Sequence, residues 1–170
     1  WADYWKARVA EGHTFGSHTW RHGSFRKDET GGTVVYRLMD GSQTLLNAAE
    51  ICAEVKKPDT RFAELTGRPL DSLWRAPGGR TTPNTLRAAE ACGYRHTAWS
   101  SAGFLGDELP SESFPNEVLL KRALANIRDG DILMAHLGIW SRKDPFAPML
   151  DPLIRGLKAQ GFCFAPLPAR

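Results

Sequence analysis

The sequence predicts an α/β fold built around a parallel sheet, and three observations support this prediction. From residue 70 onward, short apolar segments alternate with longer segments of helical periodicity. The connections between them are short, as in folds that repeat strand and helix units. The segment 132–136 is apolar up to its final histidine, which is typical of a strand buried in a parallel sheet. The length of 170 residues corresponds to about one domain, so we predict a single domain over residues 1–170.

The first twelve residues have the pattern of an amphipathic helix. Apolar residues recur at i, i+3 and i+7 from Ala2, and Gly12 can end the helix. The chain starts with Trp1 inside this pattern, and neither a charged leader nor an apolar signal segment comes first. We therefore expect the sequence to be part of a longer protein, without its N-terminal segment.

The part of the chain between residues 13 and 41 predicts little regular structure. Residues 13–18 can form a strand that ends in a loop. Residues 23–41 are rich in glycine, threonine and charged side chains, so we expect an irregular excursion with one short strand at 33–39.

Two helices are predicted next. The first is capped by Ser42 or Thr44 and runs to about Val55, with apolar residues along one side. Pro58 disfavours a helical conformation at the residue before it, so we expect this helix to end there. A shorter helix covers 60–66.

From residue 70 the predicted strands and helices alternate regularly. Thr82 and Pro83 mark the start of the first helix, because threonine is a good N-cap and proline fits the first turn. The predicted strands are 70–74, 94–99, 132–136 and 162–167, and the predicted helices are 83–91, 117–128 and 148–160.

The composition excludes several classes of protein. Apolar residues make up 42% and charged residues 24%, close to the average for globular domains. The longest apolar runs are far shorter than the ~20 residues that span a bilayer, so no transmembrane segment is predicted. The net charge is +3, from 22 Lys and Arg against 19 Asp and Glu, and the one modest basic cluster is residues 21–27. A nucleic-acid-binding protein would show a basic stripe with interleaved aromatic residues, so we expect no nucleic acid as a partner.

The cysteines give no sign of a metal site. Cys52, Cys92 and Cys163 are an odd number and contain no C-x-x-C pair. Each has apolar neighbours, so we predict buried free thiols rather than a disulfide or a thiolate metal site.

Residues that can do chemistry gather at the ends of the predicted strands. His18 and His22 follow the first strand, Arg75 follows the second, the segment 99–107 follows the third, and His136 ends the apolar strand. Because catalytic residues of parallel α/β folds lie at the C-terminal ends of strands, this placement predicts an active site.

His18 and His22 are four residues apart in H-T-W-R-H. On a helical turn the two imidazoles would share a face and could bind one divalent cation, although a surface pair has the same spacing. A zinc site also needs a third protein ligand. His13 is a rival ligand, and Asp3 and Asp40 are the other candidates within this sequence.

Two further residues are candidates by their chemistry. His136 in I-L-M-A-H-L-G can act as a general acid, since an imidazole carries a proton near neutral pH. Arg75 in W-R-A-P-G-G-R can hold a carboxylate ionised. The alternatives are a buried histidine bonded to the backbone and a surface arginine beside a turn. His96 lies at the start or middle of a predicted strand, so we expect it to be structural.

Four motifs in this order resemble those of one family. E-G-H-T-F-G-S-H-T-W-R-H is similar to the second motif of polysaccharide deacetylases, the NodB-homology group or carbohydrate esterase family 4. R-A-P-G-G resembles the third motif, residues 99–102 with Asp107 resemble the fourth, and residues 133–136 resemble the fifth. The resemblance extends from residue 11 to the end of the chain.

The resemblance implies a distorted (β/α) barrel with a divalent metal, usually Zn²⁺, at its C-terminal face. It implies that His18 and His22 bind the metal together with an aspartate of the first motif. Water activated by the metal would attack an N-acetyl carbonyl, and the backbone N–H of Gly78 would stabilise the oxyanion. His136 would protonate the departing amine.

The sequence departs from the family pattern in two places. The first motif, a strand of the T-F-D-D type, is absent, and with it the third ligand and the catalytic base. Arg75 therefore lacks the base that it would hold, and we expect the chain as given to be inactive. The fourth motif has no D-x-x-D-W, and Glu108 follows Asp107 where the family often has tryptophan. Asp107 is the residue of this motif that would orient His136.

The resemblance implies an N-acetylhexosamine polysaccharide as substrate and a location in the cell envelope or outside the cytoplasm. Trp99, Trp140 and Met134 would line the groove, with Met134 near the acetyl group, unless they are core residues. Two alternatives remain. The same barrel is similar to enzymes that hydrolyse other C–N bonds, such as those of cyclic amides, and a module without the first motif could bind glycans without catalysis.

Overall fold

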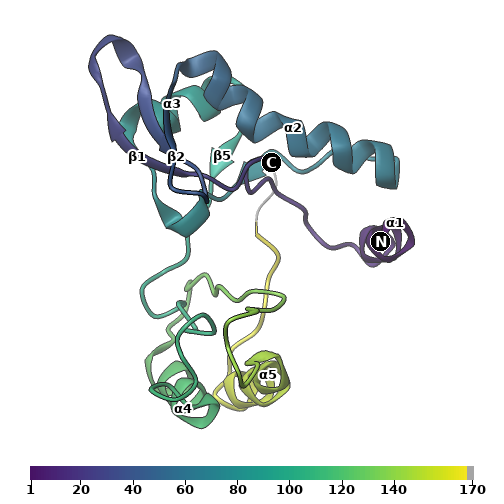
Figure 1. Ribbon diagram of the computed structural model, residues 1–170. Helices are drawn as coiled ribbons and strands as arrows, with labels where there is room; N and C mark the ends of the chain where they lie inside the picture. Colours follow the sequence, from purple (N-terminus) through teal and green to yellow (C-terminus); the bar gives the residue numbers. More distant parts are fainter. Residues whose placement is uncertain (168–170) are drawn as a thin grey trace. The chain divides into compact units, whose positions relative to one another are not determined.

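The structure, a computed structural model, describes residues 1–167 and divides the chain into two units (Figure 1). Unit 1 comprises Trp1–Ala98 together with Pro166 and Leu167, and unit 2 comprises Trp99–Ala165. Each unit has its own apolar core. The last three residues of the predicted domain, 168–170, lie outside the described residues.

Unit 1 contains an antiparallel sheet where the sequence predicted an irregular excursion. Its strands β1 (Ser24–Asp28), β2 (Val34–Arg37) and β3 (Gln43–Leu46) pair in sequence order. Phe25, Val34, Tyr36 and Leu46 face the core of the unit, and their neighbours along the strands are more exposed. The expected strand at 33–39 is therefore confirmed as β2, but the irregular excursion is wrong. The glycines and threonines that suggested a loop lie mainly in the turns and at the strand ends.

A single long helix, α2 (Ala48–Thr66), replaces the two helices predicted after residue 42. Its N-cap is Asn47, whose side chain accepts from the Glu50 N–H while the Glu50 carboxylate accepts from the Asn47 N–H. The expected caps Ser42 and Thr44 are wrong, because Thr44 lies in β3 and Ser42 immediately precedes it. The helix ends at Gly67, which adopts the left-handed conformation of a helix C-cap.

Pro58 lies inside α2 and does not end it, contrary to the prediction. A proline removes one backbone hydrogen bond from a helix. In α2 this loss is offset by packing on both sides of the proline. Val55 is fully buried before it, and after it the ring of Phe62 packs against that of Phe15 at 4.8 Å.

The first helix is confirmed as α1 (Ala2–Ala10), and it packs against α2. None of its residues is fully buried. The ring of Trp5 meets that of Phe15 edge to face at 6.1 Å, and this contact connects α1 to the aromatic pair formed with α2.

The two-residue strand β4 (Leu73–Trp74) of unit 1 has a parallel neighbour on each side. On one edge β4 pairs with β5 (Arg95–His96), with helix α3 (Pro83–Ala91) between them in the chain. On the other edge Ser17 donates its N–H to Leu73 and accepts from the Arg75 N–H. The predicted strands 70–74 and 94–99 are therefore present but shorter, and the predicted strand 13–18 is reduced to one bridge at Ser17. Thr82 caps α3 and Pro83 occupies its first position, as predicted.

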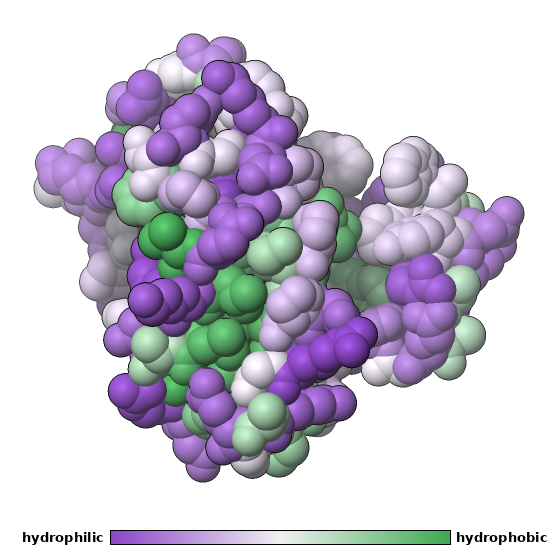
Figure 2. Space-filling model, turned by 90° about the horizontal axis from the view of Figure 1, so that it is seen from below, coloured by the Kyte–Doolittle hydropathy of each residue, from purple (hydrophilic) through white to green (hydrophobic). Residues whose placement is uncertain are grey.

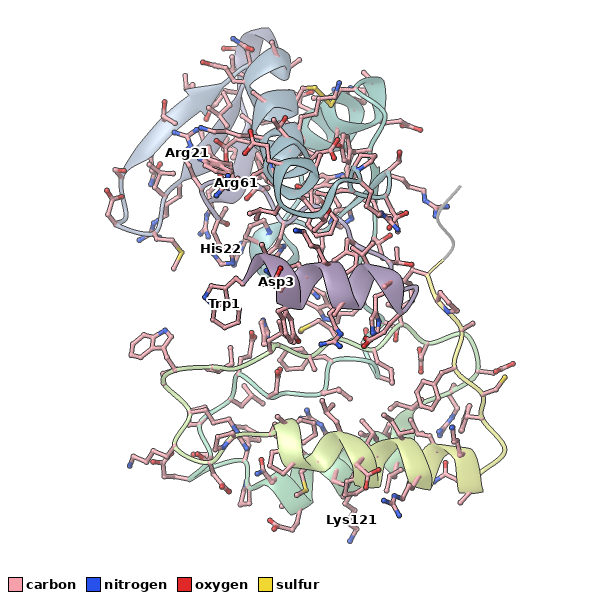
Figure 3. All side chains as sticks on the ribbon, turned by 90° about the vertical axis from the view of Figure 1, so that its right-hand side faces the viewer. Trp1, Asp3, Arg21, His22, Arg61 and Lys121 are labelled. Atoms are coloured by element: carbon pink, nitrogen blue, oxygen red, sulfur yellow. A yellow bond between two sulfur atoms is a disulfide. The ribbon has the colours of Figure 1, made fainter. Side chains whose placement is uncertain are left out.

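A disulfide joins Cys52 in α2 to Cys92 at the end of α3, with Cα atoms 6.1 Å apart (Figure 3). The prediction of buried free thiols is therefore wrong. The two cysteines are separated by 40 residues in sequence, but α2 and α3 pack together and bring them into contact. Cys163 has a free thiol, and it is exposed rather than buried.

Unit 2 is built on two helices, α4 (Asn116–Asn126) and α5 (Leu150–Ala159), which lie side by side (Figure 1). A 3-10 turn at Ala147–Met149 precedes α5. Apolar side chains also reach the surface over these helices (Figure 2). Val118 is the most exposed large apolar residue of α4, and Ile154 is that of α5. The core consists of Leu105, Leu119, Ala123, Ile127, Phe146, Leu153 and Leu157.

The predicted strands of unit 2 do not form. In the segment 132–136, Met134 makes a single parallel bridge to Phe104. A strand needs a partner along its length, and the neighbouring chain follows this segment only from Ser100 to Leu105. The segment 162–167 has no strand either, and the Phe162 N–H bonds back to Leu157 at the end of α5.

The α/β class is confirmed, with parallel pairing at β4 and an antiparallel sheet that the sequence pattern did not predict. Among residues 1–167, no helix combines the length and the apolar character that crossing a bilayer requires.

Candidate functional site

His18 and His22 lie next to each other in unit 1, with ring centroids 4.9 Å apart. They do so in a loop and not on a helical turn, so that part of the prediction is wrong. Thr19 and His22 both have positive φ, 65° and 54°, in the left-handed region that non-glycine residues rarely adopt. The left-handed backbone at these two residues, rather than helical periodicity, brings the imidazoles together.

The ring of His18 is oriented by the main chain. Its Nδ1 lies 2.6 Å from the carbonyl oxygen of Arg75, so Nδ1 carries the proton and donates it. The tautomer leaves the lone pair on Nε2, as in histidines that bind a metal through one nitrogen and a backbone carbonyl through the other. His22 is exposed, and its Nδ1 lies 3.5 Å from the sulfur of Met39.

These two imidazoles fit two positions of a zinc site, but a third ligand is not found with them. Within residues 1–167, no group of three or more His, Cys, Asp or Glu side chains is arranged to hold a metal ion. The expected candidates have other contacts. His13 pairs with Glu11 at 3.3 Å, and Asp3 lies 4.0 Å from Lys6. Asp40 accepts from the hydroxyl and N–H of Ser42, and these bonds lower its pKa.

Arg75 follows β4 directly, and Gly78 lies in the turn that comes next. The backbone of Arg75 is held from two sides, because its N–H donates to Ser17 at 2.9 Å and its carbonyl accepts from His18. Gly78 lies in the tight turn Pro77–Gly79 with φ of 61°. A left-handed φ at this position explains the glycine in the R-A-P-G-G sequence. The structure thus places the third motif against the second in unit 1.

His96 has the contacts of a structural residue, as expected. Its Nε2 accepts from the Ala76 N–H at 3.2 Å, and its ring packs edge to face on Trp74 at 4.8 Å. Burial lowers the pKa of His96, and the nearby Arg75 lowers it further. A neutral imidazole is needed here, since a protonated Nε2 could not accept the bond from Ala76.

We predict that His96→Gln weakens the pH dependence of stability below pH 6.5. The unfolded chain takes up a proton on His96 near its ordinary pKa of about 6.5, whereas the folded chain takes it up only at lower pH. The free energy of unfolding of the wild type should therefore fall with decreasing pH in this window, by at most about 1.4 kcal/mol per pH unit from this group. Glutamine can still accept from Ala76 but does not titrate. Urea denaturation at pH 7.5 and 5.5 measures both slopes, and equal slopes would contradict the prediction.

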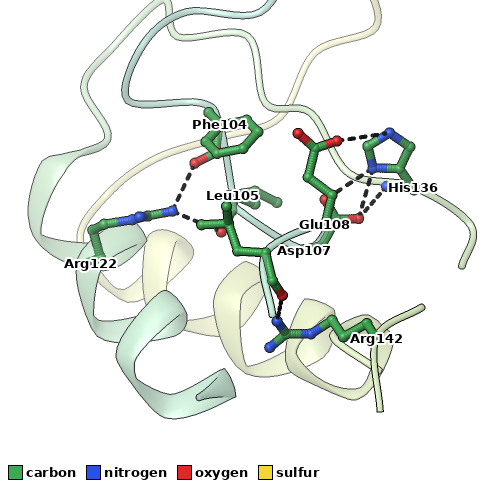
Figure 4. Close-up of polar contacts among 8 residues, drawn as sticks. Phe104, Leu105, Asp107, Glu108, Arg122, His136 and Arg142 are labelled. Atoms are coloured by element: carbon green, nitrogen blue, oxygen red, sulfur yellow. Dashed lines mark hydrogen bonds and ion pairs between the residues drawn. The ribbon is translucent and has the colours of Figure 1, made fainter. Parts of the chain in front are cut away.

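Asp107 and His136 form a hydrogen-bonded pair in unit 2 (Figure 4). The carboxylate of Asp107 is 4% exposed, and its two oxygens lie 3.1 and 3.2 Å from Nδ1 of His136. The same carboxylate accepts from the His136 backbone N–H. The Nε2 atom lies 3.7 Å from the carboxylate of Glu108. Asp107 thereby fixes the tautomer and the ring orientation, and Nε2 is the nitrogen left for chemistry.

Close backbone packing brings Asp107 to His136. A Cβ atom at Gly103 would collide with the carbonyl oxygen of Ile132, so only glycine permits this approach. Arg122 of α4 donates to the carbonyl oxygens of Phe104 and Leu105 at 3.3 and 3.2 Å, which anchors the chain just before Asp107 (Figure 4).

A small pocket lies beside this pair, with a free volume of about 50 Å³. Asp107, His136 and Arg142 are its charged or polar residues, and Ile139 and Phe146 are among its apolar ones. The pocket is far smaller than the roughly 300–1,000 Å³ of sites that enclose a whole ligand, so it has room only for a small group.

The three expected groove residues differ in their surroundings. Met134 is buried at 3% exposure, Trp140 is 99% exposed, and Trp99 is half-buried. None of the three is among the residues that line the pocket beside His136. Their contact with a substrate stays a prediction.

Sequence reasoning missed two buried charged residues. Glu54 is 7% exposed and lies on α2 close to the His18–His22 loop. Arg142 is 5% exposed and donates to the carbonyl oxygens of Leu109, Phe114 and Asp144. A signal for Glu54 is present in the sequence, because it follows Ile51 by three residues and precedes Val55, both on the apolar face of the helix.

The chain is similar to proteins of one family. A model of the polysaccharide deacetylase family matches residues 1–97. A curated relative, an uncharacterized 30.6 kDa protein of Geobacillus stearothermophilus, is 29% identical over 165 residues, which are 97% of this chain and 53% of that protein.

Solved structures show the same fold. A carbohydrate esterase family 4 pseudoenzyme from Bacillus anthracis has a TM-score of 0.66 at 19% identity, over 95% of this chain and 47% of that one. A peptidoglycan N-acetylglucosamine deacetylase has a TM-score of 0.75 at 21% identity, with coverage of 98% and 67%. A family 4 carbohydrate esterase from Streptomyces lividans has a TM-score of 0.68 at 16% identity, with coverage of 99% and 72%.

The chain spans about half the length of the Geobacillus and Bacillus anthracis proteins. The fold shared with these structures is the NodB type that the sequence motifs predicted. The family match covers more than half of the chain and includes the second and third motifs. The chain therefore belongs to the polysaccharide deacetylase family.

Proposed function

We propose that this chain carries catalytic residues of a metal-dependent hydrolase that removes N-acetyl groups from an N-acetylhexosamine polysaccharide. The observation that carries the proposal is the Asp107–His136 pair beside a small pocket. Removal of an N-acetyl group needs a proton for the departing amine, and an imidazole held by a buried carboxylate can supply it. Membership of the family supports the class of substrate.

The residues of unit 1 suit a role in metal binding. His18 and His22 would each provide one neutral nitrogen to a divalent cation such as Zn²⁺. When bound, the ion would act as a Lewis acid on water and on the carbonyl group. The Gly78 N–H would donate to the oxygen that becomes negative, and Arg75 would hold an ionised carboxylate. The third ligand and the base would come from a segment outside this sequence, with the two aspartates of the first motif.

Release of acetate tests the proposal. N-acetylglucosamine oligomers and peptidoglycan fragments are incubated with this chain and with a longer chain in which the first motif is joined to its N-terminus. We expect acetate from the longer chain with Zn²⁺, little from this chain, and none from either after treatment with a chelator. Activity that survives chelation would contradict metal dependence. Ammonia from cyclic amides, without acetate from the oligomers, would indicate hydrolysis of other C–N bonds.

One observation favours a second function, glycan binding without catalysis. The described residues 1–167 contain no third metal ligand beside the histidine pair. One of the similar structures is a pseudoenzyme of the same carbohydrate esterase family. This alternative predicts that the 170-residue chain binds the oligomers by itself in calorimetry and releases no acetate with any divalent metal.

We predict that metal affinity depends on both histidines. In the longer chain, His18→Ala or His22→Ala should weaken Zn²⁺ binding at least roughly tenfold, because each removes one of three protein ligands. His13→Ala is the matched control, since this exposed histidine pairs with Glu11 and should leave the affinity unchanged. Calorimetry with Zn²⁺ alone measures the three affinities. Tight binding by the 170-residue chain would instead indicate a third ligand within it.

A further inference from the structure

The loop that carries His18 and His22 has a strained backbone, so contacts with the rest of unit 1 must stabilise its conformation. Thr19 and His22 have φ values of 65° and 54° without being glycine. Such conformations persist only where the surrounding structure over-determines them, and they are concentrated at functional sites. Two hydrogen bonds fix the start of the loop. His18 donates to the Arg75 carbonyl oxygen, and the Thr19 N–H donates to Oγ of Ser17.

Glu54 holds the other end of the loop. Both of its carboxylate oxygens accept hydrogen bonds, and the side chain is buried, with Tyr36 of β2 as one partner. Oε1 accepts from Nε of Arg21 at 2.7 Å, and Oε2 accepts from the Arg21 backbone N–H at 3.1 Å. The carboxylate therefore bonds to the residue immediately before His22 through its main chain and its side chain (Figure 3 shows Arg21 and His22).

Tyr36 connects Glu54 to Gly23, the residue after His22, by hydrogen bonds. Its side chain is fully buried, and its hydroxyl donates to Oε2 of Glu54 at 2.9 Å. The same hydroxyl accepts from the Gly23 N–H at 2.8 Å. A Cβ atom at residue 23 would collide with the tyrosine ring, so glycine is required for this bond. The backbone is thus pinned on both sides of His22.

We propose that Glu54, acting with Tyr36, is a positioning residue that keeps His22 beside His18 so that both imidazoles can bind one ion. Neither residue would touch the ion. The inference rests on the proposed function for its purpose, while the geometry that it explains is independent of any metal. The Glu54 carboxylate bonds to the residue before His22, and the Tyr36 hydroxyl that donates to it bonds to the residue after His22. Such contacts around a ligand support its position.

The test compares Glu54→Gln and Tyr36→Phe with Glu50→Gln in the longer chain. Glutamine keeps the shape of Glu54 but presents an amide group to Arg21, and phenylalanine removes the hydroxyl while keeping the ring. Glu50→Gln is the matched control, because Glu50 lies on the same helix and bonds only at its N-terminal end. We expect about a tenfold loss of Zn²⁺ affinity for Glu54→Gln and Tyr36→Phe, and no loss for Glu50→Gln.

A second measurement without metal separates this inference from the proposed function. In the metal-free wild type, NMR should detect nuclear Overhauser effects between the C–H protons of the His18 and His22 rings, whose centroids are 4.9 Å apart. These should disappear in Glu54→Gln while the amide spectrum of β1 and β2 is retained. Unchanged effects and unchanged affinity would overturn the positioning role. Lost effects together with no Zn²⁺ binding by the wild type would support positioning and contradict the metal site.

Discussion

Replacing His136 with alanine is expected to lower kcat for N-deacetylation by roughly 10²–10⁴, the range produced by loss of a general acid. The reason lies in the tautomer. Asp107 accepts from Nδ1, so in the protonated imidazole the second proton is on Nε2, from which it can pass to an amine. An amine leaves the tetrahedral intermediate poorly without that proton. The form of the protein that releases acetate from N-acetylglucosamine oligomers is used for the measurement, and zinc content is determined for each variant.

An aryl acetate ester provides the internal control for this prediction. Its phenolate departs without protonation, so His136→Ala should slow the ester much less than the amide. Asp107→Asn should also lower kcat for the amide, because an amide side chain does not hold the Nδ1 proton as a carboxylate does. His13→Ala should leave both rates unchanged. Equal losses on ester and amide, or loss of zinc in His136→Ala, would show that His136 is a ligand or a structural residue.

Reducing the Cys52–Cys92 disulfide is expected to lower the free energy of unfolding by about 4 kcal/mol. The bond closes a loop with a sequence separation of 40 residues, and a cross-link of this length restricts the unfolded chain by about that amount. For a chain of this size the melting temperature should fall on the order of 10 °C. Urea denaturation and thermal unfolding, each with and without dithiothreitol, measure the effect.

Cys52→Ser should reproduce the effect of the reductant and abolish any further response to it. Cys163→Ser is the matched control, because this thiol is exposed and forms no disulfide. It should leave the stability and its response to dithiothreitol unchanged. A wild type whose unfolding is the same with and without reductant would contradict the prediction.

Local signals in the sequence predicted some elements well and others poorly. Thr82 and Pro83 begin α3 because the cap and the proline act within one helical turn. Asn47 and Glu50 form an equally local capping box, but the apolar residues just before them favoured an earlier start. Those residues belong to β3, whose pairing with β2 depends on residues outside the local pattern. Pro58 failed as a stop signal for a similar reason, since packing around it outweighs one lost hydrogen bond.

The candidate site was predictable in its residue types and less so in its geometry. The motifs placed His18 and His22 together, but their proximity depends on two left-handed residues and on Glu54, which is 33 residues away from Arg21. No periodicity encodes such a contact. Asp107 and His136 were matched through motif order, and the structure brings them within hydrogen-bond distance. The disulfide was missed because it joins two helices that are brought together by the fold alone.

His18 of the second motif and His136 of the fifth differ in the group that accepts their Nδ1 protons. His18 donates to a main-chain carbonyl at position 75, which every amino acid possesses. His136 donates to the side chain of Asp107. In a saturation scan, substitutions at position 75 would therefore report on the guanidinium alone and would leave the tautomer of His18 intact. Substitutions at position 107 would disturb His136 directly. The tautomer of His18 is therefore insensitive to the side chain of its hydrogen-bond partner, whereas that of His136 depends on it.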